Sequence, residues 1–276
     1  MITQQQMQTG RCRMAWLEAG TGWPVILLHA FPLNAGMWRP QLEAVPEGWR
    51  FIAPDFRGFG ATRALDRKMG LPPEDGSQGI DQYAADIGDF MDCLKLDDAV
   101  IAGLSMGGYV AFAMYRQAPA RFNGLVLADT RPQADTPAGR DGRAAMRERL
   151  AREGTRAVAD QMLPKLLSPR AHAEDAALVA RVRGMIEDAE PPGVDAAIVA
   201  MMKRPDSTDD LPRIACATLV LVGEADEITP IADAQAMQAA IPRSTLTVVP
   251  GAGHLSNLER PDAFGKTLAD FLLARL

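Results

Sequence analysis

Short, continuous runs of apolar residues recur along the chain, and each of them ends in a turn or in polar residues. Strands that helices cover on both faces show this pattern, because neither side of such a strand meets water. The runs that predict strands of a parallel sheet in this way are residues 25–28, 51–53, 99–102, 125–128 and 219–222.

Segments with helical spacing of apolar residues lie between these runs. In residues 81–96 the apolar side chains that fall on one side of a helix are Ala84, Ile87, Phe90, Met91 and Leu94. Helices are also expected over residues 110–115, 231–240 and 262–276. Strands that alternate with helices imply right-handed crossovers, so the sequence predicts an α/β fold with a doubly wound, mostly parallel sheet.

The region before the first run has a different pattern. Residues 12–18 alternate between polar and apolar side chains and lead into Gly20-Thr21-Gly22, which predicts an antiparallel hairpin at an edge of the sheet. The first residues contain no continuous apolar segment, so no secretion signal is expected. No membrane span is expected either, because the strongest apolar stretch, residues 23–31, is far shorter than the roughly 20 residues that a bilayer needs.

Residues 131–213 interrupt the alternation, because they contain no strand-like run and read as helical, with breaks expected at Pro164, Pro169, 191–192 and Pro205. The segment holds none of the 16 aromatic residues of the chain but five of its 14 methionines. A helical insertion of this composition is typical of a lid over a cleft, and an extra packing layer is the alternative. We therefore expect a core made of residues 1–130 and 214–276 and a lid made of the residues between them.

Composition narrows the class of protein. The 276 residues are 47% hydrophobic and 23% charged, as in soluble globular proteins with a sizeable core. The net charge of −6 disfavours nucleic acid as a partner, since phosphates need a basic face. Cys12, Cys93 and Cys216 are widely spaced and form no CxxC, which indicates a reducing, cytoplasmic location.

The most informative stretch is Gly-Leu-Ser-Met-Gly, centred on Ser105. A buried strand runs into it and a helical pattern follows it. Glycines two before and two after the serine allow a strand-to-helix turn that is too tight for side chains, and such a turn lifts the serine hydroxyl above the sheet. The helix N-terminus also supplies free backbone N–H groups. Ser105 is therefore the candidate nucleophile.

A serine needs a base, and the chain has three histidines. His172 lies in a polar stretch of the insertion and is expected at the surface. His29 ends an apolar run and is expected to hydrogen-bond the loop there. His254 follows the strand-like residues 246–249 in a glycine-flanked loop, at the end of the sheet where α/β proteins hold their ligands. His254 is therefore the candidate base.

The base needs a carboxylate that fixes its tautomer. Asp226 follows residues 219–222 at a strand end, and we favour it over Glu224 and Glu227, which should point elsewhere in a tight turn. The competing candidate is Asp129, which directly follows residues 125–128 and could reach the same histidine.

With Ser105, Asp226 and His254 in this order, the sequence resembles the α/β-hydrolase fold superfamily over essentially its whole length. Three further segments resemble family motifs: His29-Ala-Phe-Pro-Leu with Trp38, Asp55-Phe-Arg-Gly-Phe-Gly, and Gly253-His254 with Leu258-Glu-Arg-Pro. The most similar branches are small bacterial esterases, enol-lactonases of the 3-oxoadipate type and cofactor-free haloperoxidase- or perhydrolase-like enzymes.

The resemblance implies covalent acyl transfer, with an oxyanion hole formed by the N–H groups of Phe31 and Met106. One departure is Ala30, where the family pattern has glycine; its methyl group should fit if the local φ is negative. A serine at the strand-to-helix turn argues against dehalogenase or epoxide hydrolase chemistry, because relatives with these activities use a carboxylate nucleophile at that position. No cofactor or metal is expected, since too few histidines remain and no dinucleotide or phosphate motif occurs.

The expected substrates are small carboxylic esters with short to medium acyl or alkyl groups, because an insertion without aromatic residues offers an aliphatic ceiling. Phe31, Trp38 and Tyr109 could line the floor, although Trp38 and Tyr109 are equally suited to the core. Lactone, perhydrolytic and carbon–carbon bond hydrolysis remain alternatives, as does a binding protein without activity. The oligomeric state does not follow from the sequence.

Overall fold

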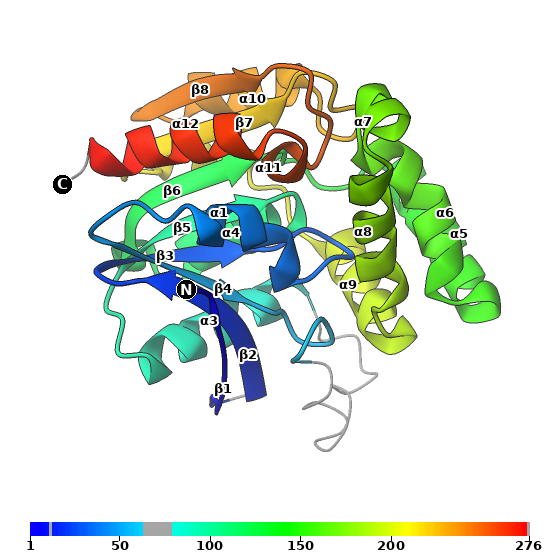
Figure 1. Cartoon of the computed structure of the whole chain (residues 1–276), viewed down its shortest axis with the longest axis horizontal. Coiled ribbons are helices and arrows are strands. Elements are labelled where there is room, and N and C mark those ends of the chain that lie inside the picture. The colour runs from blue at the N-terminus through cyan, green and yellow to red at the C-terminus, as the bar shows by residue number, and fades with distance from the viewer. Residues whose placement is uncertain (11–12, 63–78, 275–276) are drawn as a thin grey trace.

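The computed structural model describes residues 1–10, 13–62 and 79–274. Eight strands form one sheet in the order β1-β2-β4-β3-β5-β6-β7-β8 (Figure 1). β2 pairs antiparallel with β1 and β4, and every pair from β4 to β8 is parallel. The strands are β1 (Thr3–Gln8), β2 (Arg13–Gly20), β3 (Trp23–Leu28), β4 (Trp49–Pro54), β5 (Ala99–Leu104), β6 (Phe122–Ala128), β7 (Thr218–Gly223) and β8 (Ser244–Val249).

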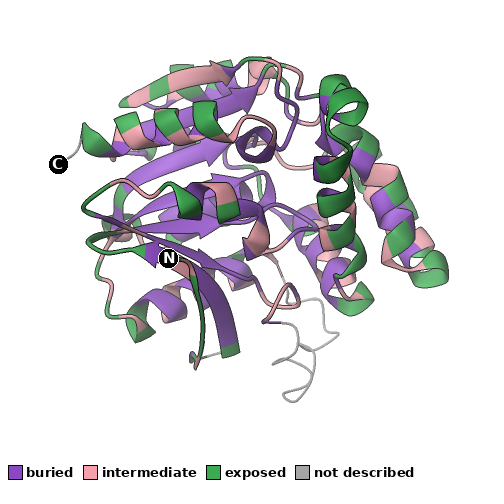
Figure 2. Cartoon of the chain, viewed as in Figure 1, coloured by how far each residue is buried: buried purple, intermediate pink, exposed green. Residues whose placement is uncertain are grey.

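Helices cover both faces of the sheet, which is why the central strands are apolar throughout. α1 (Arg39–Glu43) and α12 (Pro261–Leu273) pack together on one face, and α3 (Ile80–Cys93), α4 (Met106–Gln117) and α10 (Ile231–Ala240) lie on the other (Figure 1). The short helices of the core are η1 (Ala35–Trp38), η2 (Pro119–Arg121) and α11 (Ser256–Glu259). Buried residues concentrate in the sheet and on the helix faces turned toward it (Figure 2). The predicted α/β fold with a mostly parallel sheet is therefore confirmed.

The predicted edge hairpin is confirmed only in part: β2 pairs antiparallel with β1 at one edge of the sheet, but the turn at Gly20 and Gly22 does not join two paired strands. β2 and β3 follow each other in sequence around Gly20 and Gly22. In the sheet, however, β4 lies between them. The edge strand is instead β1, whose sequence TQQQMQ is almost wholly exposed and carries no apolar alternation. Cys12, the first residue of the predicted alternation, lies outside the described residues.

Between β6 and β7 the chain forms helices and no strand, in a segment that is described throughout. These helices are α5 (Pro137–Glu153), α6 (Thr155–Leu166), α7 (Pro169–Glu174), α8 (Ala176–Glu187), α9 (Pro191–Lys203) and η3 (Thr208–Arg213). Proline occupies the first position of α5, α7 and α9, where no N–H partner is needed. The expected break at Pro164 does not occur: α6 includes this residue and ends two residues later, at Leu166.

Among the described residues, no helix is both long and apolar enough to cross a membrane. The last two residues of the C-terminal helix predicted over 262–276 lie outside the described part of the chain, and the rest of that prediction corresponds to α12.

Candidate active site

Ser105 lies at the turn between β5 and α4, where the backbone is strained. Its φ of 54° and ψ of −114° fall in a region that side chains rarely adopt. A Cβ on Gly103 would lie 2.3 Å from the carbonyl oxygen of Gly107, and one on Gly107 would lie 2.2 Å from that of Leu28. Only glycine fits at these two positions, so the turn carries the Ser105 hydroxyl above the sheet as the sequence predicts.

The structure brings Ser105, His254 and Asp226 together from three separate loops. His254 Nε2 lies 2.8 Å from Ser105 Oγ, and His254 Nδ1 lies 2.8 Å from Asp226 Oδ2. His254 and Asp226 are 1% and 5% exposed, and Ser105 is 9% exposed. The three side chains therefore form one continuous, largely buried hydrogen-bonded relay at the carboxyl edge of the sheet.

Four hydrogen bonds hold the Asp226 carboxylate. Oδ1 accepts from the backbone N–H groups of Ile228 and Thr229, and Oδ2 accepts from Thr229 Oγ1 (2.6 Å) as well as from His254. Burial by itself raises the pKa of Asp226, but the charge of His254 and the hydrogen bonds from His254 and Thr229 outweigh it and leave the pKa below the usual value. An ionised Asp226 can thus keep the Nδ1 proton on His254. Thr229 was not singled out from the sequence, although its position before Pro230 at the start of α10 marks it as a turn residue.

Asp129, the competing acid, does not contact His254 through any hydrogen bond. It is fully buried at the end of β6, with a positive φ of 45°. Its Oδ1 accepts from the N–H of Gly223 (2.7 Å), and its Oδ2 is hydrogen-bonded to Ser256 Oγ (2.5 Å). Of the other two acids weighed from the sequence, Glu224 and Glu227 are both exposed, and Glu224 accepts from the N–H of Gly251.

The loop after β3 carries the first of the two predicted oxyanion donors. Phe31 is buried in this loop, and Met106 is the first residue of α4, so its N–H lies at a helix N-terminus. The backbone of Ala30 does not have a positive φ, and its N–H donates to the sulfur of Met37. The methyl group of Ala30 is therefore accommodated without strain, as the sequence led us to expect.

The two remaining histidines lie apart from the relay. His29 is fully buried; its Nε2 accepts from the N–H of Phe56, and its Nδ1 bonds the carbonyl of Ala30. Burial lowers the pKa of His29 to about 4, with the hydrogen bond to Ala30 acting weakly in the opposite direction. His172 is exposed on α7. Both positions agree with the expectations from the sequence.

Trp38 and Tyr109 belong to the core. Trp38 is completely buried, with its ring 6.0 Å from that of Phe264. Tyr109 lies under the guanidinium group of Arg204, 4.2 Å from the ring centre. Because Arg204 comes from the end of α9, this contact fixes the base of the helical insertion to α4.

The insertion also reaches the loop of His254 directly. The N–H of Leu255 donates to the carbonyl of Leu166, and Glu259 accepts from the N–H groups of both Gly253 and Ser168. The junction between α6 and α7 is thus bonded directly to Leu255 and, through the Glu259 carboxylate, to Gly253. Glu259 is part of a motif seen in the sequence, but this bridging contact could not be read from it.

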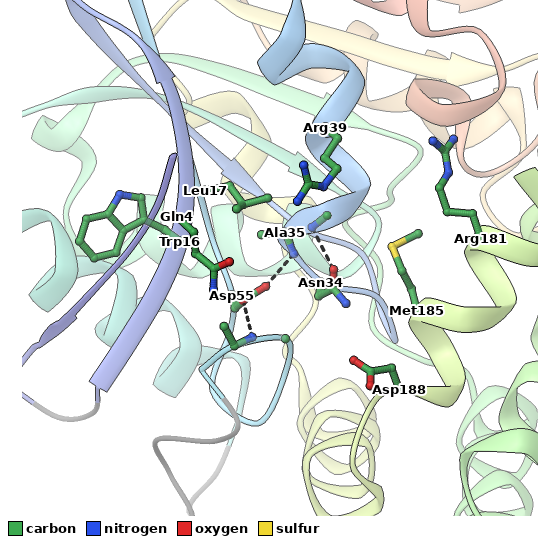
Figure 3. Close-up of a pocket in the computed structure, with 13 residues that line it drawn as sticks. Gln4, Trp16, Leu17, Asn34, Ala35, Arg39, Asp55, Arg181, Met185 and Asp188 are labelled. Atoms are coloured by element: carbon green, nitrogen blue, oxygen red, sulfur yellow. Dashed lines mark hydrogen bonds between the residues drawn. The ribbon is translucent and has the colours of Figure 1, made fainter. Parts of the chain in front are cut away.

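A cavity of about 540 Å³ lies between η1 and α8, with Arg39 of α1 and Arg181 of α8 on facing sides (Figure 3). Its lining contains none of the three residues of the relay. Asp55 lines it from the core, where its carboxylate accepts from the N–H groups of Ala35 and Ala61. The residues that we describe include no cluster of three or more histidine, cysteine or acidic side chains that could hold a metal ion.

An eight-stranded, mostly parallel sheet with a strained serine at a strand–helix turn and a histidine–aspartate pair at its carboxyl edge defines the α/β hydrolase class. The model of the alpha/beta hydrolase fold family matches residues 24–261, and the chain belongs to that family.

Solved structures and curated proteins agree with this assignment. A thermophilic esterase from Thermogutta terrifontis superposes with a TM-score of 0.91 and 37% identity, over 99% of both chains. 3-Oxoadipate enol-lactonase 1 of Acinetobacter baylyi is 25% identical, over 99% of this chain and 96% of its own length. A putative non-heme chloroperoxidase of Synechocystis is 29% identical, over 98% of this chain and 99% of its own. An esterase, an enol-lactonase and a haloperoxidase-like protein, the three branches that the sequence resembles, are thus all among the similar proteins.

Proposed function

We propose that the protein is a serine hydrolase that cleaves carboxylic esters of short to medium acyl or alkyl groups through an acyl-enzyme. The observation that carries this proposal is the relay itself, in which His254 lies 2.8 Å from both the Ser105 hydroxyl and the Asp226 carboxylate. A nucleophile, a base and an orienting acid within hydrogen-bond reach are what acyl transfer requires.

In the proposed mechanism, His254 Nε2 takes the proton of Ser105 as its Oγ attacks the ester carbonyl. Asp226 stabilises the imidazolium that forms, and the N–H groups of Phe31 and Met106 hold the oxyanion. The tetrahedral intermediate collapses as His254 gives its proton to the leaving alcohol. His254 then activates a water molecule, which releases the acid and restores Ser105.

We further propose that residues 131–213 act as a lid, with residues 1–130 and 214–276 as the core. The insertion accepts a hydrogen bond from the N–H of Leu255 next to His254, and its Ser168 shares the Glu259 carboxylate with Gly253, which supports a place next to the reaction. Its lack of aromatic residues supports aliphatic rather than flat ring substrates. The widely spaced free thiols of Cys93 and Cys216 support a cytoplasmic location.

Lactone hydrolysis is the second candidate. A lactone is an internal ester, so the same residues would open it without any change of mechanism. The name of the Acinetobacter baylyi relative, an enol-lactonase similar over 99% of this chain, favours this candidate specifically. The name of the Synechocystis relative supports a test for peroxide-dependent halogenation with the same protein.

The test is turnover of a panel of p-nitrophenyl esters and simple lactones of graded chain length by the wild type and by Ser105→Ala. We expect kcat to fall by at least about 10⁴-fold in the variant with the melting temperature unchanged. Ser244→Ala, at the start of β8, serves as the matched control and should retain full activity. A wild type that turns over no ester or lactone, or a Ser105→Ala variant with normal kcat, would contradict the proposal.

A further inference from the structure

The end of β6 is the point at which the three loops of the relay are joined. Ser105 donates its N–H to the carbonyl of Ala128, and Thr130 Oγ1 donates to the carbonyl of Ser105 (2.8 Å). Between these two residues lies Asp129, whose N–H donates to the carbonyl of Leu221 on β7. The segment 128–130 therefore contacts the loop of the nucleophile and the strand that carries the acid.

The side chain of Asp129 extends this connection to the histidine. One oxygen accepts from Gly223, three residues before Asp226, and the other is hydrogen-bonded to Ser256, two residues after His254. Asp129, Ser256 and the relay histidine are each 0–1% exposed, so water does not compete for these bonds. Asp129 also holds a positive φ, a conformation that persists only where surrounding contacts impose it.

We propose that Asp129 is a positioning residue, which locks the loop of Asp226 to the loop of His254 and so sets the geometry of the relay. This inference rests on the proposed function. It assigns to the competing acid a role that needs no contact with the substrate or with His254.

Burial and charge both act on the Asp129 carboxyl group. Complete burial and the nearby charge of Asp226 raise the pKa of Asp129 well above its usual value; the hydrogen bonds from Ser256 and Gly223 lower it, and the charge of Glu259 raises it again. Ser256 Oγ donates to Oδ2, and the N–H of Gly223 donates to Oδ1. These two bonds satisfy a carboxyl group that water does not reach.

This arrangement predicts opposite results for two substitutions. Asn has the shape of Asp129 and can keep both contacts, because its Oδ1 can accept from the N–H of Gly223 and its Nδ2 can donate to Ser256 Oγ. Ala removes both bonds and frees the two loops from each other. We expect Asp129→Ala to lower kcat by about 10- to 100-fold with KM within about threefold of wild type, since a small misplacement of reacting groups costs rate rather than binding. Asp129→Asn should stay within about threefold of wild type in both parameters.

The experiment measures kcat, KM and melting temperature with p-nitrophenyl butyrate. Asp86→Ala is the control for loss of a buried carboxylate, because Asp86 is almost fully buried on α3 and binds Arg57 and Gln82 rather than a loop of the relay. It should lower the melting temperature without lowering kcat.

Two results would overturn the inference: normal kcat in Asp129→Ala, or equal loss in Asp129→Asn and Asp129→Ala. If Asp129→Ala does not fold, Ser256→Ala replaces it and should lose about three- to tenfold in kcat; normal kcat there counts against the inference. The rate at which a fluorophosphonate labels Ser105 gives the same comparison without any ester substrate. A wild type that is labelled but turns over no ester contradicts the proposed function alone.

Discussion

The loops of the relay and the helices of the insertion are held together in different ways. In the loops, buried side chains bind backbone groups: Asp226 accepts from two N–H groups and Asp129 from one, and Thr130 donates to a carbonyl. In the insertion, arginines pair with acids mostly at the surface, as Arg170 and Arg183 do with Glu174 and Glu187. Buried bonds to backbone fix positions closely, whereas exposed ion pairs leave helices free to adjust.

This contrast fits the different tasks that we propose for the two regions. The relay must hold three atoms in line, whereas a lid must fit around substrates of different shape. The junction of α6 and α7 is the exception, since it is bonded to the loop of His254. The insertion should therefore be rigid at that junction and at Arg204, and more adjustable along its exposed helices.

Among substitutions other than that of Ser105 itself, the largest effect should follow from loss of the charge on Asp226. In Asp226→Asn the amide cannot keep the proton on His254 Nδ1, so we expect kcat to fall by about 10³- to 10⁴-fold. Steady-state kinetics with a p-nitrophenyl ester measure this loss. Glu227→Gln, which removes an exposed carboxylate from the same loop, is the control and should have normal kcat. Loss in Asp129→Asn that exceeds the loss in Asp226→Asn would transfer the role of the acid to Asp129.

Within the insertion, Arg204 should matter most to stability. Its side chain is 4% exposed, pairs with Asp135 at 2.7 Å, and binds the carbonyls of Met201 and Gln133. Arg204→Met leaves the two carbonyls without this donor and Asp135 with Arg143 as its remaining ion-pair partner, and we expect the free energy of unfolding to fall by about 3 kcal/mol. Urea titration measures the change. A loss below about 1 kcal/mol would show that the base of the insertion is as loosely held as its surface.

The pH dependence of the free energy of unfolding tests whether His29 is buried as a neutral imidazole. Its pKa is about 4 in the folded protein and 6.5 when unperturbed, so the unfolded chain binds a proton between these values and the folded chain does not. The contribution of His29 to the free energy of unfolding is therefore fully present above pH 6.5 and is lost as the pH is lowered to about 4. The full loss amounts to about 3 kcal/mol. Urea titrations at several pH values in this range give the free energy of unfolding of the wild type and of His29→Gln as a function of pH. The free energy should change more steeply with pH in the wild type; equal pH dependence would contradict the burial of a neutral imidazole.

The smallest effect should come from an exposed pair of the insertion. Arg170 and Glu174 are each about three-fifths exposed and lie one turn apart on α7. We expect Arg170→Gln to change the free energy of unfolding by less than about 0.5 kcal/mol, and by still less in high salt. The same urea titration measures it. A loss similar to that of Arg204→Met would remove the distinction between the two kinds of contact.

Much of the fold could be predicted from the sequence, because the central strands are buried on both sides and read as unbroken apolar runs. β1 could not, since an edge strand of glutamines is stabilised by backbone pairing with β2 and by no apolar face. The pairing across the turn at Gly20 and Gly22 could not be predicted either. A tight turn in the sequence does not reveal that β4 lies between β2 and β3 in the sheet. The break expected at Pro164 is wrong, since α6 includes this proline and ends two residues later.

The relay residues could be predicted because each follows a strand and belongs to a recognisable motif. Their partners could not, since contacts such as Thr229 with Asp226 or Ser256 with Asp129 depend on where separate loops meet. Sequence reasoning placed Asp129 near the histidine but could not separate a side chain that bonds His254 from one that bonds its neighbours. Only the geometry of the folded chain makes that distinction.

The claim on which the account depends is that the Ser105 hydroxyl becomes covalently acylated. Intact-mass and peptide mass spectrometry of protein quenched in acid after mixing with p-nitrophenyl acetate tests it directly. We predict one acetyl group per chain, located on Ser105 and absent from Ser105→Ala. Rapid ester hydrolysis with no acyl group on Ser105, or an acyl group on another residue, would contradict the account.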